Sequence, residues 1–579
     1  MPTIPLNDLG KGVNKDLLPA ELGAGVWSDA VNFRFRNGFA ERFDGLAVAN
    51  SSGYANTYWI DSHADATVRY VFAGGSDGKT YMFSGVYTDV TRYADTIIIA
   101  SITRVGTTAT LTTTANHGRT TGDSVEVYGA SPSQYNGTFT ITVTGATTFT
   151  YTMGSDPGAS ASPVGAYVYL GSNPNFTADS GAGLQRWTGG SLNGVYVVNH
   201  PVDGLYYWPG SGTRLRRFPQ SYVSDSARIF KNYVVQLART VNGTKFQHNV
   251  AWSAAAEPGS IPASFDASST NDAGDVDLAE TPGAMVDCLP LGDANIIYKQ
   301  DARYAMTYIG GNDVFRFQRL PGNDGLMFRD CVVNTPVGHV FLTQSGDVMV
   351  HQGGEAKSIA RGRVENWIRS LYDFSVYKAR AFLALCPEKS EVWVCFPSTP
   401  DTIGGWPYKI AVWNWENDTW GTFSFESGVL QFGLRFARAG LWTSGTFGNE
   451  YRLIASFGVA LYTLDPLRQG KFGGNVLTST LERTGLHFDD RDQFKTLHRS
   501  RWNIDGTAGK TATISHGSSK TADGTVTYAT SATYTIGTTD YVDARATKGR
   551  FCAIKLVTTS DAAFSVRSAD LDVTAGGKR

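Results

Sequence analysis

One histidine and three carboxylates fall within six residues in the segment from His487 to Asp492, H-F-D-D-R-D. Carboxylates clustered in a loop can bind Ca²⁺. Here the D-x-D-x-D-G spacing of a calcium loop is absent, and Arg491 would repel a cation. We predict a solvated interdomain loop with local Asp–Arg pairing. The remaining histidines show no H-x-x-H or H-E-x-x-H spacing, so no zinc site is expected at any of them: His63, His117, His200, His248, His339, His351, His498 and His516.

Glycan cleavage is the next chemistry to test. The segment Ser76 to Tyr81 (S-D-G-K-T-Y) approximates the Asp-box of sialidases, but it is one residue short and has Tyr where Trp is expected. We predict a hairpin turn at Asp77–Gly78. A sialidase also needs an arginine triad beside a tyrosine nucleophile. The candidate arginines follow no locating motif: Arg214, Arg216, Arg217, Arg303, Arg316 and Arg319.

Two further segments could contact a ligand. The basic run Arg214 to Phe218 (R-L-R-R-F) could bind phosphate, although an exposed strand face or a subunit contact is the commoner role. The segment Trp413 to Trp420 (W-N-W-E-N-D-T-W) could stack on a sugar or a base. Alternation places Trp413 and Trp415 on one face, which is what a β-sheet core needs, so we predict core packing.

Other catalytic and phosphate-binding motifs are missing from the sequence. There is no G-x-S-x-G nucleophile motif and no G-x-x-x-x-G-K-[ST] loop. Gly10–Lys11–Gly12 has neither the preceding strand nor the following helix that a phosphate loop requires. We therefore predict a protein that is not an enzyme, with no catalytic, cofactor-binding or metal-binding residues.

Composition favours a β-rich protein of several domains. The chain has 579 residues, 12% aromatic residues and 64 glycines, and its length predicts two to four domains. Charged residues make up only 18%, below the roughly 25% of typical soluble domains. The net charge is −2, without the basic excess of proteins that grip DNA. Such a balance permits a surface past which DNA slides.

The cysteines and the terminus bear on the compartment. Five cysteines are scattered without a C-x-x-C pair: Cys288, Cys331, Cys386, Cys395 and Cys552. A turn at Pro387–Ser390 would place Glu391, and not Cys395, opposite Cys386. We predict free, buried thiols in a protein assembled in a reducing cytoplasm. We find no signal peptide and no apolar stretch of the roughly 20 residues that span a bilayer.

The elements that position these residues are short alternating strands joined by tight turns. The same pattern of alternating strands and turns recurs along the chain: 68–85, 194–209, 227–239, 249–253, 338–351, 391–396, 410–420 and 451–464. Repeating units too small to bury their own faces predict a β-propeller, with about seven or eight blades. One helix is predicted, from Ile359 to Tyr372, with Val364, Trp367, Ile368 and Leu371 on one face.

Two stretches interrupt the repeats. From about Ile97 to Val164 threonine dominates, with a turn at His117–Val125 and a strand at Tyr135–Phe139, which predicts a small β-module inserted in a loop of one blade. After about residue 476, short strands predict a C-terminal β-sandwich. The predicted fold is mainly β: a propeller-like core with an inserted β-module and a C-terminal sandwich. The expected boundaries are 1–45 for an arm and first hairpin, 46–96 and 166–475 for the propeller, 97–165 for the insertion and 476–579 for the sandwich.

The N-terminal region begins with a glycine-punctuated arm, Asn7 to Pro19. The segment Val26 to Gly45 follows and alternates as a hairpin that turns at Asn37–Gly38. We expect the hairpin to supply strands to the propeller. Residues 2–19 lack a core of their own and should pack on a neighbouring domain or subunit. Their deletion is then expected to impair assembly more than folding.

This order of segments resembles that of tail nozzle proteins (tail tubular protein B) of short-tailed bacteriophages. The resemblance covers the arm and hairpin, the inserted module, and the C-terminal strands Gly549–Leu556 (G-R-F-C-A-I-K-L) and Ala569–Val573 (A-D-L-D-V). It implies a virion protein, assembled in the host cytoplasm, that forms a ring at the distal end of the tail. The ring is expected to be a hexamer below an adaptor ring, with possible contacts to tail fibres and no membrane span. It would retain viral DNA and then conduct it during ejection, without sequence-specific binding.

Two alternatives remain open at this stage. A tail plug, or packaged-DNA stabilisation protein, resembles a nozzle at the level of this sequence. A glycan-binding or glycan-cleaving propeller belongs to a different class.

Overall fold

A computed structural model gives the fold. It describes residues 3–50, 57–64, 68–75, 77–84, 86–92, 96–162, 164–169, 175–178, 187–210, 214–218, 222–372, 378–397, 407–424, 435–436, 440–441, 451–457, 460–465, 469–472 and 475–578. The chain divides into two compact units. The first contains Met1–Ile60, Leu289–Tyr308 and Arg316–Arg579, and the second contains Asp61–Cys288 and Ile309–Phe315.

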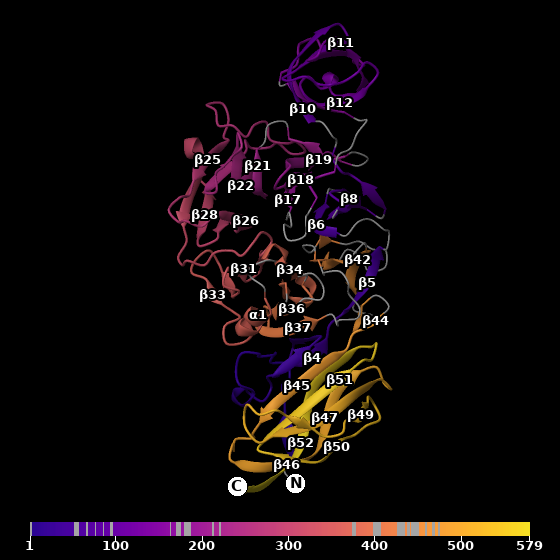
Figure 1. Ribbon diagram of the computed structural model, residues 1–579, viewed down its shortest axis with the longest axis vertical. Helices are drawn as coiled ribbons and strands as arrows, with labels where there is room; N and C mark the ends of the chain where they lie inside the picture. The colour runs from indigo at the N-terminus through magenta and orange to yellow at the C-terminus, as the bar shows by residue number, and fades with distance from the viewer. Residues whose placement is uncertain are drawn as a thin grey trace. The chain divides into compact units, whose positions relative to one another are not determined.

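The fold is mainly β, with a β-propeller-like core of small antiparallel sheets (Figure 1). Within the described residues the core has seven such sheets, and six of them are built from strands that follow one another along the chain. The first two sheets contain β6 (Thr57–Ala64), β7 (Arg69–Gly75), β8 (Thr80–Phe83) and β9 (Tyr87–Asp89), then β17 (Thr188–Leu192), β18 (Val195–His200), β19 (Gly204–Trp208) and β20 (Arg216–Arg217). The third contains β21 (Val223–Phe230), β22 (Tyr233–Val241), β23 (Thr244–Lys245), β24 (Asn249–Trp252) and β25 (Gly274–Asp277).

The next three sheets continue this meander. They contain β26 (Met285–Leu291), β27 (Ala294–Lys299), β28 (Arg303–Tyr308) and β29 (Phe315–Arg319); β30 (Val332–Thr335), β31 (Gly338–Leu342), β32 (Val348–His351) and β33 (Lys357–Ser358); and β34 (Phe382–Cys386), β35 (Glu391–Cys395), β36 (Lys409–Asn414) and β37 (Thr419–Ser424). The predicted hairpins at 338–351 and 410–420 are confirmed by the pairing of β31 with β32 and of β36 with β37.

The seventh sheet combines strands from both sides of the core in sequence. Its order is β38 (Arg435–Phe436), β41 (Ile454–Phe457), β42 (Ala460–Asp465), β5 (Gly45–Asn50), β43 (Lys471–Phe472) and β44 (Asn475–Val476). The early strand β5 pairs antiparallel with β42 and parallel with β43. Strands β39 (Gly440–Leu441) and β40 (Tyr451–Arg452) form a separate pair. The chain thus ends its core by returning to the first strand of that core.

The predicted insertion is a β-module within the second unit. Its sheet has the order β13 (Gly137–Thr140), β12 (Ser124–Ala130), β16 (Val164–Tyr169), β10 (Thr96–Val105), β11 (Thr108–Thr113), β15 (Thr148–Thr152) and β14 (Thr142–Val143). A core of its own, which includes Leu111, Val125, Tyr135 and Phe149, fills the module. The module lies between the first and second core sheets in sequence.

The C-terminal sandwich is built from two sheets (Figure 1). One contains β46 (Gln493–Gly506), β50 (Val542–Gly549) and β52 (Phe564–Lys578), and the other contains β45 (Ser479–Leu486), β47 (Thr511–Ser519), β48 (Thr527–Tyr528), β49 (Ala532–Thr535) and β51 (Phe551–Thr558). The N-terminal region adds to both, because β1 (Thr3–Leu6) pairs with β52 and β2 (Asp29–Val31) pairs with β45.

The first hairpin, β3 (Phe33–Arg36) and β4 (Phe39–Arg42), lies between the core and the sandwich. Asn37 and Gly38 both have positive φ angles, 51° and 79°, as a two-residue type I′ turn requires. β3 pairs with β37 of the core and β4 pairs with β52 of the sandwich. The hairpin was predicted to supply strands to the propeller; it does so and also joins the sandwich, which creates one ten-stranded sheet.

The predicted helix is shorter than expected. α1 spans Glu365–Leu371, whereas residues 359–364 form turns. Gly362 has a φ of +70°, which an α-helix cannot accommodate, so the helix begins after it. The apolar face is correct, since Val364 and Ile368 are buried. The described part of the chain also contains five short 3-10 helices: η1 (Pro19–Glu21), η2 (Ser133–Tyr135), η3 (Gly311–Asp313), η4 (Lys378–Arg380) and η5 (Pro387–Lys389).

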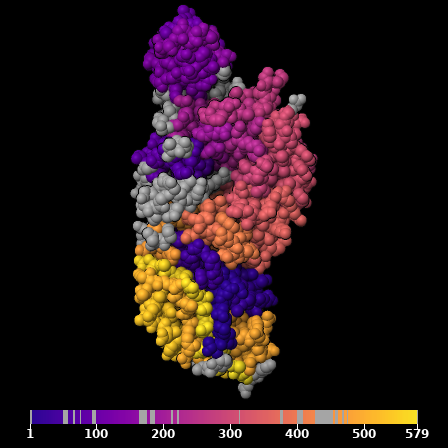
Figure 2. All heavy atoms as spheres, turned by 180° about the vertical axis from the view of Figure 1, so that it is seen from behind, coloured from indigo at the N-terminus to yellow at the C-terminus, as the bar shows by residue number. Residues whose placement is uncertain are grey.

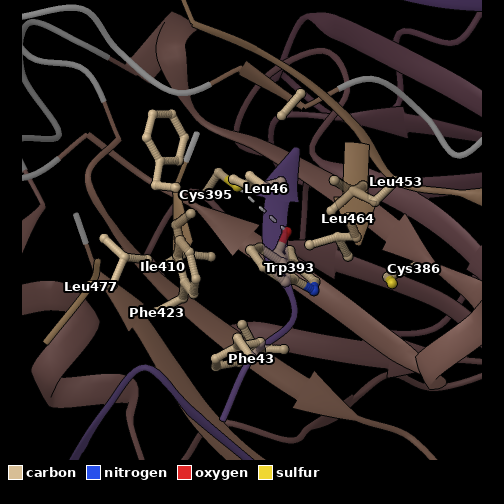
Figure 3. Close-up of a cluster of buried hydrophobic side chains, with 14 of the residues drawn as sticks. Phe43, Leu46, Cys386, Trp393, Cys395, Ile410, Phe423, Leu453, Leu464 and Leu477 are labelled. Atoms are coloured by element: carbon tan, nitrogen blue, oxygen red, sulfur yellow. Dashed lines mark hydrogen bonds between the residues drawn. The ribbon is translucent and has the colours of Figure 1, made fainter. Parts of the chain in front are cut away.

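A buried cluster in the first unit connects the sixth and seventh core sheets (Figure 3). Phe43, which follows the first hairpin, packs edge-on against Trp393 and Phe423 at ring separations of 5.3 and 5.2 Å. Leu46 of β5 and Leu464 of β42 belong to the same cluster. Phe43 and Leu46, which follow the hairpin in sequence, therefore attach the end of the hairpin to the core.

All five cysteines are free and buried, as predicted. Cys386 lies opposite Glu391 in the β34–β35 hairpin, which confirms the predicted register. Burial raises the pKa of the Cys552 thiol to about 12 and that of Cys386 well above its ordinary value.

The buried thiols give a direct test of the fold. We expect Ellman's reagent to label none of the five cysteines in the native protein within minutes, because the thiolate is the reactive form and burial disfavours it. All five should react after unfolding in guanidinium chloride. Rapid labelling of the native protein would contradict the buried environment described here.

Candidate functional site: the arm junction

The arm, residues 3–28, runs over the first unit and contacts the sandwich, the hairpin and the core (Figure 2). Its central anchor is Trp27, which is fully buried. The indole Nε1 of Trp27 donates to the carbonyl of Leu9 at 2.8 Å, and its backbone N–H donates to the carbonyl of Gly12 at 2.9 Å. These bonds fold the arm back on itself, and the side chains of Leu9 and Val13 are buried.

The glycines of the arm serve close backbone approach. A Cβ at Gly10 would lie 2.2 Å from the carbonyl carbon of Gly38, in the hairpin turn. Gly12 has a φ of +91° and lies against the backbone of Trp420, so a side chain there would be strained as well as crowded. The Gly10–Lys11–Gly12 segment is thus a packing element.

The arm also contacts the edge of β37 and the start of α1. The backbone N–H of Val13 donates to the carbonyl of Trp420 at 2.8 Å. The Asp16 carboxylate accepts the backbone N–H groups of Asn366 and Trp367, each at 3.2 Å. A carboxylate at this position satisfies free helix N–H groups and complements the helix dipole. A residue distant in sequence therefore caps α1.

The H-F-D-D-R-D segment forms hydrogen bonds with the arm. His487 Nε2 donates to the carbonyl of Ala20 at 3.1 Å, and Arg491 donates to the same oxygen at 3.3 Å. Arg483 of β45 donates to the carbonyls of Pro19 and Leu22, both at 2.7 Å. Asp489, Arg491 and Asp492 are exposed, as the predicted solvated loop requires, and Arg491 also bonds to the arm backbone, which the sequence did not predict.

A buried ion network lies where the hairpin meets the sixth core sheet. The guanidinium of Arg34 pairs with Asp44 at 3.0 Å and with Glu391 at 2.9 Å, and the three side chains are at most 2% exposed. Lys389 reaches Asp44 at 3.1 Å. Trp393 Nε1 donates to Glu391 at 3.1 Å. The guanidinium also lies 4.7 Å from the Phe43 ring centre.

The network keeps its central charge in spite of burial. Burial alone would lower the pKa of Arg34, but Glu391 and Asp44 outweigh it and raise that pKa above its ordinary value. Burial would likewise raise the pKa of Asp44, yet Arg34 and then Lys389 lower it. For Glu391 burial prevails over Arg34 and raises the pKa. Arg34 is thus the charge on which both carboxylates depend.

A second buried arginine ties the hairpin to the sandwich. Arg42 Nε donates to Ser479 Oγ and its Nη2 donates to the Leu477 carbonyl, both at 2.8 Å, and Nη1 bonds the Ser560 carbonyl. Burial lowers the pKa of Arg42 to about 10, partly opposed by Asp561. Arm, hairpin, core sheet and sandwich are therefore joined by backbone ladders and two buried arginines.

The basic run 214–218 is an internal contact of the second unit. Arg214 pairs with Asp89 at 3.2 Å, and Leu215 and Phe218 are buried. Arg216 pairs with Glu126 of the inserted module. The hydroxyl of Tyr128 donates to the carbonyl of Arg217 at 3.1 Å. The run therefore anchors the module to the core, a role that the sequence did not predict.

The remaining arginine candidates also have separate partners. Arg303 donates to the carbonyls of Pro321 at 2.7 Å and Gly354 at 3.3 Å. Arg319 donates to Asn323 at 2.9 Å, and Arg316 lies on β29 with an exposed side chain. Five of the six arginines lie on three strands, β20, β28 and β29, and Arg214 precedes β20.

The Asp-box-like segment and the tryptophan segment are structural. Asp77 accepts from the backbone N–H of Lys79 at 3.0 Å and from the Tyr81 hydroxyl at 3.2 Å, in the predicted turn; Ser76 lies outside the described residues. Trp413 pairs across the strands with Trp420, and both are buried. Trp415 lies in the turn after β36, beyond the alternation of the strand, and is half-buried, so core packing is confirmed for Trp413 and not for Trp415.

One pair of histidines comes together unexpectedly, through a tyrosine of the neighbouring sheet. His339 and His351 are directly opposite in the β31–β32 hairpin, and the Tyr298 hydroxyl lies 2.8 Å from His339 Nδ1 and 2.7 Å from His351 Nε2. The hairpin predicted at 338–351 contained this signal, since a turn centred on Ser345 places the two histidines in register.

Their hydrogen bonds fix the tautomers. His339 Nε2 must donate to the Pro290 carbonyl at 3.0 Å, and His351 Nδ1 accepts the backbone N–H of Gly353 at 3.0 Å. His351 Nε2–H therefore donates to Tyr298, whose hydroxyl donates to His339 Nδ1. Burial lowers the pKa of His339 to about 4. Burial, with Arg303 and His339 nearby, lowers that of His351 to about 3.

These pKa values predict an acid-sensitive fold. Below pH 6.5 the unfolded chain protonates both histidines while the native state does not, until pH reaches about 4 for His339 and about 3 for His351. The free energy of unfolding should therefore fall by up to about 1.4 kcal/mol per pH unit for each histidine. Urea unfolding between pH 8 and pH 5 measures the slope, and the H339Q/H351Q variant should show a shallower one. An unchanged slope in that variant would contradict the assignment.

Within the described residues no group of three or more His, Cys, Asp or Glu side chains is placed to hold a metal ion. No helix in the described part of the chain has the length and apolar character needed to cross a membrane.

No protein-family model and no curated protein sequence matches this chain. Among solved structures it is similar to BamB from Moraxella catarrhalis, with 9% identity, a TM-score of 0.33 and coverage of 72% of this chain and 96% of that one. It is also similar to the Cps50 (Swd1) β-propeller domain of Myceliophteria thermophila (7%, TM-score 0.35, 72% and 99%) and to virginiamycin B lyase from Staphylococcus aureus (7%, TM-score 0.34, 73% and 98%). The fold assignment for this chain rests on the strand pairing described above.

Proposed function

We propose that the protein is a subunit of the distal tail nozzle of a short-tailed bacteriophage. The order of arm, hairpin, inserted module and C-terminal strands supports this proposal through its resemblance to that family. The subunits would form a ring, expected to be a hexamer, that binds the tail adaptor ring. The ring would retain the packaged DNA and then conduct it into the host.

The observation that carries the proposal is the ten-stranded sheet through which the hairpin joins the core to the sandwich. A channel wall that resists the pressure of packaged DNA must transmit load between its layers. Continuous backbone ladders and the buried Arg34 and Arg42 contacts are suited to that task, because they couple core, arm and sandwich by direct bonds.

The charge arrangement supports passage of DNA in preference to tight binding. The net charge is −2, and two arginines of the run Arg214–Phe218, Arg214 and Arg216, pair with Asp89 and Glu126. Arginines engaged by carboxylates offer little to phosphates, and fewer phosphate contacts mean a smaller salt-dependent barrier to sliding.

Light scattering and electron microscopy of the purified protein, with cryo-imaging of the phage particle, test this function. We expect an open ring of several copies and its density at the tail tip. Density that closes the portal would identify a tail plug, or packaged-DNA stabilisation protein. A stable monomer that turns over a glycan would replace the nozzle by a glycan-cleaving propeller.

A further inference from the structure

A pocket of about 340 Å³ lies where the hairpin meets the sandwich, entirely within the first unit. Its lining includes residues of β4, β52 and β46, three strands that pair side by side in the order β4–β52–β46; Figure 1 labels these strands. The side chains of Asp505 and Arg567 are 60% and 45% exposed, so the pocket is open to solvent. The lining side chains that the argument uses are Arg36, Asn37, Phe39, Glu41, Asp505 and Arg567.

Strand register places two carboxylates on one face of the β4–β52–β46 strands. Glu41 of β4 and Asp505 of β46 both lie opposite Ser565 of β52. Directly opposite residues point to the same face of a sheet. Because neighbouring strands are about 4.8 Å apart, the backbones of Glu41 and Asp505 are about 10 Å apart, with Ser565 between them. The row therefore offers hydrogen-bond acceptors at both ends and a hydroxyl in the centre.

Each carboxylate has its own arginine. Arg36 bonds both oxygens of Glu41, at 2.7 and 3.2 Å. Arg567 donates to Oδ2 of Asp505, with its Nε at 2.9 Å, and does not occupy Oδ1. The same guanidinium stacks over the Phe39 ring at 4.4 Å. The two cations and two anions cancel, so the pocket presents strong donors and acceptors without net charge.

The buried side chain of Gln469 supports this arrangement through two hydrogen bonds. Gln469 donates to Glu41 Oε1 at 3.3 Å, and its own carbonyl oxygen accepts the backbone N–H of Phe564 at 3.2 Å. Glu41 is thereby fixed by both Arg36 and Gln469. Such support keeps a binding group in place before a ligand arrives.

We propose that this pocket binds a neutral saccharide. Hydroxyl groups donate to carboxylates and accept from guanidinium and amide groups, so a ring of hydroxyls matches the alternating donors and acceptors described here. The volume is at the low end of the range for small-molecule pockets, which limits the ligand to a few sugar units. Phe39 adds an apolar wall. Since both carboxylates are bonded to arginines, the site binds the sugar without cleaving it.

This inference stands independently of the nozzle proposal, because it depends only on the pocket. The test uses the full-length protein and saturation-transfer NMR with a panel of neutral sugars: glucose, galactose, mannose, N-acetylglucosamine and their β-linked disaccharides. We expect saturable binding of at least one sugar. The variants Asp505→Ala and Arg567→Ala should each weaken it about tenfold or more, because each removes a charged hydrogen-bonding group.

The matched control is Lys510→Ala, which breaks an exposed Lys–Asp pair of the same sandwich, 2.7 Å long, outside the pocket. It should bind sugar as the wild type does. Hydrogen exchange of the wild type, with and without sugar, locates binding independently of any variant, and β4 and β52 should gain protection. The proposal is overturned if no sugar of the panel binds, if protection arises elsewhere, or if binding survives both variants. Tighter binding of glucose 6-phosphate than of glucose, or hydrolysis of a disaccharide, would also overturn it.

Discussion

Replacement of Arg34 by methionine should destabilise the first unit by about 3–5 kcal/mol, the usual effect of removing one partner from a buried ion pair. The side chain is 2% exposed and pairs with two carboxylates that are each 1% exposed. Methionine retains much of the apolar stem but leaves Asp44 with Lys389 alone and Glu391 without its guanidinium. Urea unfolding, followed by tryptophan fluorescence and by hydrogen exchange of β35, measures the loss.

A matched control and a rescue separate charge from packing. Lys245→Met breaks an exposed pair with Asp225 and should cost at most about 1 kcal/mol. The double variant R34M/E391Q removes the carboxylate left without a cation, keeps the Asp44–Lys389 pair, and should regain part of the stability, because buried pairs can often be replaced by neutral groups. A double variant less stable than R34M would show that packing of the guanidinium, and not charge balance, dominates at this position.

Local features of the fold could be predicted from the sequence because they depend on neighbouring residues. The Asn37–Gly38 turn, the opposition of Cys386 and Glu391 and the hairpin at 338–351 all follow from turn chemistry and a two-residue period. The same local logic failed at Trp415, because β36 ends at Asn414 and the turn begins one residue earlier than alternation suggested. It also overextended the helix, which cannot pass through Gly362.

The junction itself could not be predicted, because its pairs are remote in sequence. Thr3 donates to Asp572 at 2.7 Å across 569 residues, and Asp16 caps a helix 350 residues away. No local period specifies such partners. The pocket has the same origin, since Glu41 and Asp505 meet only when β4 and β46 pair with the two sides of β52. The sequence also did not mark Arg34 and Arg42 as buried. Arginines that alternate with apolar residues in a strand are equally expected on its exposed face.

Deletion of residues 2–19 should impair folding of the first unit before it impairs assembly. The sequence alone suggested the opposite order, with an arm packed on a neighbouring domain or subunit; the neighbouring domain is confirmed by the pairing of β1 with β52. The structure places the arm on its own chain, with Leu6, Leu9 and Val13 buried. Burial of an aliphatic side chain contributes about 1.5–3 kcal/mol, so the loss of these three approaches the whole stability of an average domain, about 5–15 kcal/mol.

The deletion would also expose backbone groups of β52 and α1. Residues 569–572 of β52 lose the pairing with β1, and a bare strand edge promotes aggregation. Asn366 and Trp367 lose the Asp16 cap. Hydrogen exchange should therefore show lost protection in β52, β45 and α1, whereas β22 of the second unit serves as an internal control and should retain its protection. Lys11→Ala, at an exposed arm position, is the control variant and should leave both units unchanged. The contrary result would be a deleted protein that keeps full protection in β52 and α1 but no longer forms rings. The arm would then act between subunits, and its intramolecular contacts would not stabilise the fold.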